Sequence, residues 1–260
     1  ELEKNEDELT LINDTHVALH DLLSELDLPK VSVPESHIHI ITPENYKKCS
    51  FRGRGITYFG QIYLQRSSDR SRFLRDLSHE MLHVASMRVT LVSHNKELKN
   101  GKDFHSVRIG ERQSGLEFYP KEKYKRFEGL NEAVIELAAA ELRQQISQKG
   151  KTHFDKWEKD KLTVFAYPHP NLLMEVLGRI FSNSEEIRHW KLSLYRDLFE
   201  GTYRSIKQIG QIWKKRFGEN IVPLLSQMDG SDESAAHVAA ALGLNELAQM
   251  IRTQIQETRT

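Results

Sequence analysis

Apolar residues recur at helical spacing along most of the chain, and one region near its start has a different pattern of apolar and polar residues. Residues 7–28 carry leucines at mostly helical spacing as far as Pro29, which predicts an amphipathic helix. Residues 31–66 instead alternate between apolar and polar positions, which predicts a small antiparallel or mixed sheet. A second amphipathic helix is expected from capping residues at 67–69 to about Val92.

The rest of the chain is expected to be mainly helical after one hairpin. Residues 104–119 contain two apolar stretches separated by glycines and indicate this hairpin. A third helix is expected from about Gly129 to Gln148, and helical spacing continues over 151–260, with a terminal helical hairpin that includes 234–243. The pattern predicts an α+β fold with a core over 1–150 and a helical C-terminal subdomain over 151–260.

Composition and charge narrow the classes of function. The 260 residues contain 37 Lys and Arg against 37 Asp and Glu, and this zero formal charge argues against bulk attraction to nucleic acid or an anionic membrane. No apolar stretch approaches the roughly 18 to 20 residues that span a bilayer. The single cysteine, Cys49, cannot form an intrachain disulfide and mildly favours a reducing compartment such as the cytoplasm. The sequence leaves both localisation and oligomeric state open.

The main chemical signal is the pentapeptide His79-Glu80-Met81-Leu82-His83, which lies inside the second predicted helix. Positions i and i+4 of a helix lie one above the other, so His79 and His83 can direct their ring nitrogens at one cation. Glu80 is rotated by about 100° around the helix, where its carboxylate can take a proton from a water molecule at that cation. Two ordinary helix histidines would give the same pattern by chance.

A second segment, Asn131-Glu132-Ala133 followed by Glu136, resembles the second motif of the thermolysin-like gluzincins, a family of zinc peptidases. In that family the first glutamate is the third zinc ligand, and the acid one turn later hydrogen-bonds a ligating histidine. The resemblance implies these roles for Glu132 and Glu136, and helical geometry agrees because the two lie on one face. His94 and His105 are alternative third ligands, although neither precedes an acid by one helical turn.

The resemblance covers only residues 77–86 and 129–137. The segment between His83 and Glu132 is longer than in thermolysin itself, and Glu136 stands where thermolysin-like enzymes have aspartate. The motif pair implies the gluzincin arrangement, with a zincin-like fold and one Zn²⁺ per chain. A hairpin in the inserted segment is expected to form a wall of the active-site cleft.

These motifs predict a zinc metallopeptidase that hydrolyses a peptide or protein substrate with Glu80 as general base. The alternative is a catalytically silent zinc-binding module with a regulatory or interaction role. By analogy with zincins, an edge strand that holds the substrate is expected at Gln61, Ile62 and Tyr63. Candidate oxyanion stabilisers, none within a motif, are Tyr167, His169 and Tyr203, followed by Tyr119, Tyr124, His189 and Arg204.

Overall fold

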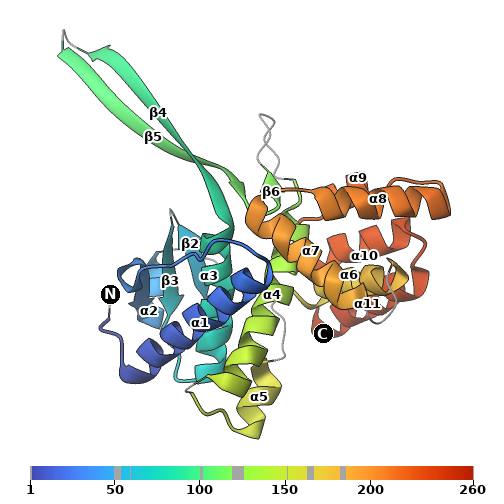
Figure 1. Cartoon of the computed structure of the whole chain (residues 1–260), viewed down its shortest axis with the longest axis horizontal. Helices are drawn as coiled ribbons and strands as arrows, with labels where there is room; N and C mark the ends of the chain where they lie inside the picture. Colours follow the sequence, from blue (N-terminus) through green and yellow to red (C-terminus); the bar gives the residue numbers. More distant parts are fainter. Residues whose placement is uncertain are drawn as a thin grey trace.

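The computed structural model has an α+β architecture, as the sequence predicts. A three-stranded sheet and helix α1 (Glu6–Glu25) lie on one side of helix α4 (Glu128–Lys149), and the C-terminal helices lie on the other (Figure 1). The structure describes residues 2–49, 54–58, 60–99, 102–118, 126–150, 152–162, 167–181 and 186–259, with the backbone alone over most of 88–114.

The three-stranded sheet is mixed, which the alternating pattern over 31–66 left open. Strand β1 (Ile38–Ile41) pairs in parallel with β3 (Gln61–Gln65), and β2 (Gly55–Tyr58) pairs antiparallel with the other side of β3. The strand order is therefore β1-β3-β2, with β3 in the centre and β2 at an edge. A 3-10 turn (Glu35–His37) precedes β1, and a short helix α2 (Pro43–Lys48) follows it.

Helix α3 (Arg70–Ser86) packs against this sheet and carries the histidine pentapeptide. It begins after Asp69, whose side chain accepts a hydrogen bond from the backbone N–H of Arg72, and its fully buried face is formed by Leu74, Leu77, Met81 and Leu82. The predicted continuation of this helix to Val92 is wrong. The chain becomes a strand at Met87, because the residues Met87–Lys99 pair with a strand later in the chain and this pairing overrides the helical pattern.

Strands β4 (Met87–Lys99) and β5 (Lys102–Ser114) form a long antiparallel ribbon, and the short β6 (Glu117–Phe118) pairs with the end of β5. The hairpin predicted over 104–119 therefore has the wrong partner strand, since residues 104–109 pair with residues 92–97 of β4. Strands β4 and β5 can form many more backbone hydrogen bonds with each other than β5 can form with the two-residue β6. The ribbon extends away from the helices rather than forming a wall over them (Figure 1).

Helix α4 lies at the centre of the molecule and contacts α1, α3, α5, α6, α7 and α9. The predicted helix over 129–148 and the helical character of 151–260 are confirmed. The C-terminal helices are α5 (Lys156–Leu162), α6 (Pro168–Phe181), α7 (Glu186–Glu200), α8 (Arg204–Phe217), α9 (Val222–Gln227), α10 (Asp232–Ala241) and α11 (Asn245–Arg259).

The expected terminal helical hairpin is the α10–α11 pair, which turns at Gly243 with a φ of 74° that glycine adopts without strain. One continuous apolar core extends from Leu11 in α1 to Ala248 in α11, so the C-terminal helices share the core of the sheet and α4. The proposed boundary at residue 150 stays a prediction. Within the described part of the chain, every helix is too short or too polar to cross a membrane.

Candidate metal centre

The two sequence motifs meet between α3 and α4. Nε2 of His79 and Nε2 of His83 lie 3.1 Å apart, as expected for histidines one turn apart on a helix. Glu132, in the second turn of α4, places Oε2 at 3.2 Å from the His79 nitrogen and at 3.5 Å from the His83 nitrogen. Among the described residues, this is the cluster of histidine and carboxylate side chains that could hold a metal ion.

The spacing of these three atoms fits a tetrahedral zinc site. With metal–ligand bonds of 2.0 to 2.2 Å, the edge of a coordination tetrahedron is about 3.3 to 3.6 Å long. The three observed separations run from 3.1 to 3.5 Å. The histidine nitrogens and the carboxylate oxygen can therefore occupy three corners of one tetrahedron and leave the fourth for another ligand.

The orientation of the His79 ring also fits a metal. Its Nδ1 lies 2.9 Å from Oε2 of Glu136, so a neutral ring carries its proton on Nδ1 and donates it to that carboxylate. Nε2 then presents a lone pair to the Glu132 carboxylate, which is itself only an acceptor. Either a second proton on the ring or a metal cation between Nε2 and the carboxylate satisfies both groups, and a metal takes the place of that proton when it binds.

Attraction between the two histidines and the nearby glutamates shifts the pKa values of the cluster. Burial alone would lower the pKa of His79, but hydrogen bonds to Glu132 and Glu136 outweigh it and raise the pKa well above its usual range. The pKa of His83 is also raised, because the Glu132 carboxylate outweighs its burial. Burial would raise the pKa of Glu132, yet the two histidines hold it well below its usual range. The site therefore favours positive charge at its centre.

Behind the cluster, Glu136 is held by a buried arginine. Oε1 of Glu136 lies 3.0 Å from Nη2 of Arg143, and both side chains are fully buried. Nε of Arg143 donates to the backbone carbonyl of Leu162 at 2.9 Å, so the guanidinium is fixed between α4 and the end of α5. The result is a continuous chain of contacts from Leu162 through Arg143 and Glu136 to His79.

Glu80 lies on the sheet side of the cluster and is held by the edge strand β2. The hydroxyl of Thr57 donates to Oε2 of Glu80 at 2.8 Å. A Cβ atom on Gly55 would lie 2.8 Å from Cγ of Glu80, so the strand leaves room for this glutamate only because residue 55 is glycine. The negative charge of Glu80 also helps to raise the pKa values of His83 and Tyr167.

Tyr167, one of the candidate oxyanion stabilisers, lies at the cluster. Its ring centroid is 5.9 Å from that of His79. Burial, with the negative charges of Glu132 and Glu80, raises the pKa of this tyrosine, so the group stays a neutral donor. Tyr167 comes from the turn before α6, where its carbonyl accepts from the backbone N–H of Asn171 at 3.1 Å.

The structure gives His169 and Tyr203 other partners. The ring nitrogens of His169 lie 2.6 Å from Oε1 of Gln254 and 2.7 Å from Oδ1 of Asp232, so this histidine ties α6 to α10 and α11. The hydroxyl of Tyr203 donates to the backbone carbonyl of Leu116 at 2.9 Å and thereby fixes the turn between β5 and β6. Neither side chain belongs to the metal-binding cluster.

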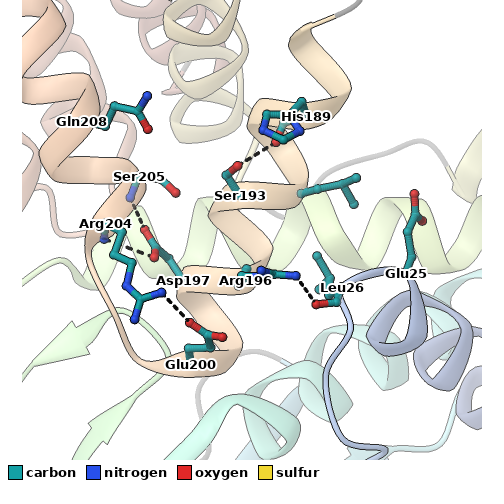
Figure 2. Close-up of a pocket in the computed structure, with 11 residues that line it drawn as sticks. Glu25, Leu26, His189, Ser193, Arg196, Asp197, Glu200, Arg204, Ser205 and Gln208 are labelled. Atoms are coloured by element: carbon teal, nitrogen blue, oxygen red, sulfur yellow. Dashed lines mark hydrogen bonds and ion pairs between the residues drawn. The ribbon is translucent and has the colours of Figure 1, made fainter.

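His189 and Arg204 line a separate cavity of about 390 Å³ between α7, α8 and the end of α1 (Figure 2). Several of its charged groups already have partners, such as Arg196, which donates to the backbone carbonyl of Leu26. Arg204 pairs with Glu200 at 3.8 Å, and the Asp197 carboxylate accepts the N–H groups at the start of α8. Tyr119 and Tyr124 fall outside the described residues, as do the side chains of His94 and His105.

The prediction of a substrate-binding edge strand at Gln61, Ile62 and Tyr63 is wrong. These residues belong to β3, which has β1 on one side and β2 on the other and so has no open edge. Ile62 is fully buried, and Oε1 of Gln61 is engaged by His39 at 2.9 Å. Among the strands that the structure describes, β2 is the edge strand on the side of Glu80.

Three residues that shape the site escape the sequence analysis. Arg143 follows Glu136 by seven residues, a spacing that puts both on one helix face and would have been a usable signal. Thr57 and Gly55 carry no local signal, because their role depends on how β2 packs against α3.

Comparisons with protein-family models, with curated proteins and with solved structures find no significant match for this chain.

Proposed function

We propose that this protein is a zinc-dependent peptidase of the gluzincin type. The observation that carries the proposal is the convergence of His79, His83 and Glu132 from two helices at tetrahedral spacing, beside the buried Glu80. Glu80 supports an enzyme rather than a silent zinc-binding module, because a metal site without activity does not need a carboxylate beside its ligands.

The surrounding fold supports a zincin-like arrangement. Helix α3 packs against a small mixed sheet whose edge strand, β2, runs antiparallel to β3 and contacts the helix at Glu80. The outer backbone groups of an edge strand can pair with an extended peptide, largely independent of the peptide's sequence. We therefore assign β2, in place of β3, as the strand that would hold a polypeptide substrate.

Each residue of the site is assigned one role in peptide hydrolysis. Zinc bound by His79, His83 and Glu132 would supply a Lewis acid that polarises a carbonyl and lowers the pKa of a water molecule. Glu80 would accept the proton of the attacking water and deliver it to the leaving amine. Glu136 keeps the proton of His79 on Nδ1, and the Tyr167 hydroxyl would donate to the oxyanion that forms at the substrate carbonyl.

The test begins with zinc content, measured by elemental analysis on protein purified without metal-affinity resin and dialysed against a weak chelator. We expect about one zinc per chain, as one three-residue site implies, and its loss in Glu132→Ala. The matched control Glu246→Ala, an exposed glutamate on α11, should retain zinc. Absence of zinc from the unmodified protein, after incubation with zinc salts, would overturn the proposal.

Hydrolysis is then measured with a mixed library of fluorescence-quenched peptides. Glu80→Gln should retain zinc and lower kcat by about 10² to 10⁴-fold, the usual contribution of a general base. Zinc binding without cleavage of any peptide or denatured protein would support the silent module instead. Equal activity in Glu80→Gln would exclude the assigned mechanism.

A further inference from the structure

The turn between β5 and β6 lies at the base of the ribbon and connects the two helices of the candidate metal centre (Figure 1). It consists of Gly115 and Leu116. The N–H of Gly115 donates to the backbone carbonyl of Ser86, the last residue of α3, at 3.0 Å. The N–H of Leu116 donates to Oδ1 of Asn131, near the start of α4, at 2.9 Å. Two consecutive residues of one turn thus hold both helices.

Each of these contacts lies close in sequence to a metal-binding side chain. Ser86 follows His83 by three residues, and its hydroxyl donates to the backbone carbonyl of His83 at 3.2 Å. Asn131 directly precedes Glu132. Three hydrogen bonds in sequence therefore connect the backbone of His83 with the residue beside Glu132. Because His83 and Glu132 belong to different helices, the 3.5 Å between their ligand atoms depends on how these helices are held together.

Burial prevents water from replacing the contacts of this turn. Ser86, Leu116 and Asn131 are all fully buried. A buried N–H that loses its acceptor is strongly unfavourable, because no water can take the place of the acceptor. The hydroxyl of Tyr203, at the start of α8, also donates to the carbonyl of Leu116 at 2.9 Å. The turn is therefore fixed relative to α3, α4 and α8.

The packing around Gly115 leaves no room for a side chain. A Cβ atom at this position would lie 2.5 Å from Oδ1 of Asn131 and 2.5 Å from Cδ1 of Leu198. The φ of Gly115 is 57°, a left-handed conformation that glycine adopts without strain. The turn can therefore approach α4 this closely only because residue 115 is glycine, and any larger residue would displace Asn131, Leu198 or the turn itself.

We propose that the turn of Gly115 and Leu116 is the positioning element of the candidate metal centre, with Asn131 as its positioning residue on α4. The turn sets the separation of His83 and Glu132 through the backbone of their helices. None of its residues is assigned a contact with metal or substrate. The inference rests on the metal binding of the proposed function and does not depend on peptide hydrolysis.

The test is a titration of the full metal-free chain with Co²⁺, which absorbs visible light strongly in a tetrahedral site and weakly in an octahedral one. Gly115→Ala should bind Co²⁺ about tenfold more weakly and with a weaker visible band, since contacts that hold metal ligands in place typically contribute 10- to 100-fold. The matched control is Gly243→Ala. Its φ of 74° gives similar backbone strain, but nothing lies within 4 Å of the added Cβ atom, so binding should be unchanged.

A milder variant avoids the steric clash. Tyr203→Phe keeps the ring, whose centroid is 5.1 Å from that of Phe127, and removes only the donor to the Leu116 carbonyl. We expect Co²⁺ binding about threefold weaker, as for the loss of one neutral hydrogen bond at a distance from the ligands. The control Tyr195→Phe removes the hydroxyl of a fully buried tyrosine on α7 and should bind Co²⁺ like the unmodified protein.

The outcomes separate this inference from the proposed function. Absence of Co²⁺ binding by the unmodified protein would overturn the metal centre and the positioning element together. Binding by the unmodified protein, with Gly115→Ala and Tyr203→Phe matching their controls in affinity and spectrum, would overturn the positioning element alone. Circular dichroism establishes that each variant is folded, and if Gly115→Ala does not fold, the comparison of Tyr203→Phe with Tyr195→Phe decides.

Discussion

Nδ1 of His79 and Oε2 of Glu136 lie 2.9 Å apart, in a contact that joins the two helices of the candidate metal centre. The contact decides which nitrogen of His79 is protonated, and so which nitrogen faces Glu132. Because Glu136 is fully buried, no water competes for this position. The ring of His79 is therefore oriented before any metal binds.

We expect the substitution Glu136→Gln to weaken zinc binding by about tenfold or more. The amide keeps the size of the side chain but is a weaker acceptor for the His79 proton, and partners of this kind typically contribute 10- to 100-fold in metal affinity. Competition with a chromophoric chelator measures the change. An unchanged zinc affinity would show that the contact does not prepare the ligand.

Removing the guanidinium behind this carboxylate should cost stability. Arg143→Met leaves Glu136 buried without its ion-pair partner, and breaking a buried pair in this way costs about 3 to 5 kcal/mol. Urea unfolding in excess chelator measures the loss without a contribution from bound zinc. The double variant Arg143→Met/Glu136→Gln should recover part of it, since no unpaired charge remains; a double variant as unstable as the sum of its parts would contradict this.

The hydrogen bond between Thr57 and Glu80 predicts an effect on rate without an effect on zinc. Thr57→Val keeps the shape of the side chain but removes the donor at 2.8 Å that orients the Glu80 carboxylate. We expect kcat to fall about tenfold, which corresponds to one charge-assisted hydrogen bond. Thr253→Val, at an exposed position on α11, is the control. A drop in zinc content would instead indicate that β2 supports the ligands.

Tyr167→Phe tests the assignment of the oxyanion donor. The variant retains the ring beside His79 and loses only the hydroxyl, so zinc content should stay the same. Loss of one such donor typically lowers kcat by about 10²-fold or more, with little change in KM. Steady-state kinetics on the best peptide of the library distinguishes this from a role in substrate binding, in which KM would rise and kcat would remain.

Local spacing predicts two pairs of side chains that share a helix face, and the resemblance to the gluzincin motif pair implies that the two pairs meet. His79 and His83 are one turn apart, as are Glu132 and Glu136, and the structure adds only that the two helices lie side by side. The same reasoning fails for the substrate strand. Whether β2 or β3 is at the edge depends on the parallel pairing of β1 with β3, a contact between distant residues that no local pattern encodes.

The end of α3 shows a second limit of local patterns. Val84, Ala85 and Val92 fit a helical stripe, and the chain leaves the helix at Ser86 only because β5 supplies a partner strand for the residues that follow. The positions of the candidate oxyanion donors also depend on contacts between distant elements rather than on local spacing. Tyr167 and His169 are two residues apart, yet one faces the cluster and the other joins α6 to the last two helices.

The ribbon of β4 and β5 affects how the residues of the site on α3 and those on α4 come together during folding. Its strands bring the end of α3 next to Gly115, whose N–H donates to the carbonyl of Ser86 at 3.0 Å. Once the ribbon has formed, the loop left to close before α4 is much shorter than the whole intervening sequence, and its closure entropy falls by about 1 kcal/mol. The segment that separates His83 from Glu132 in sequence thus reduces the entropy cost of bringing them together during folding.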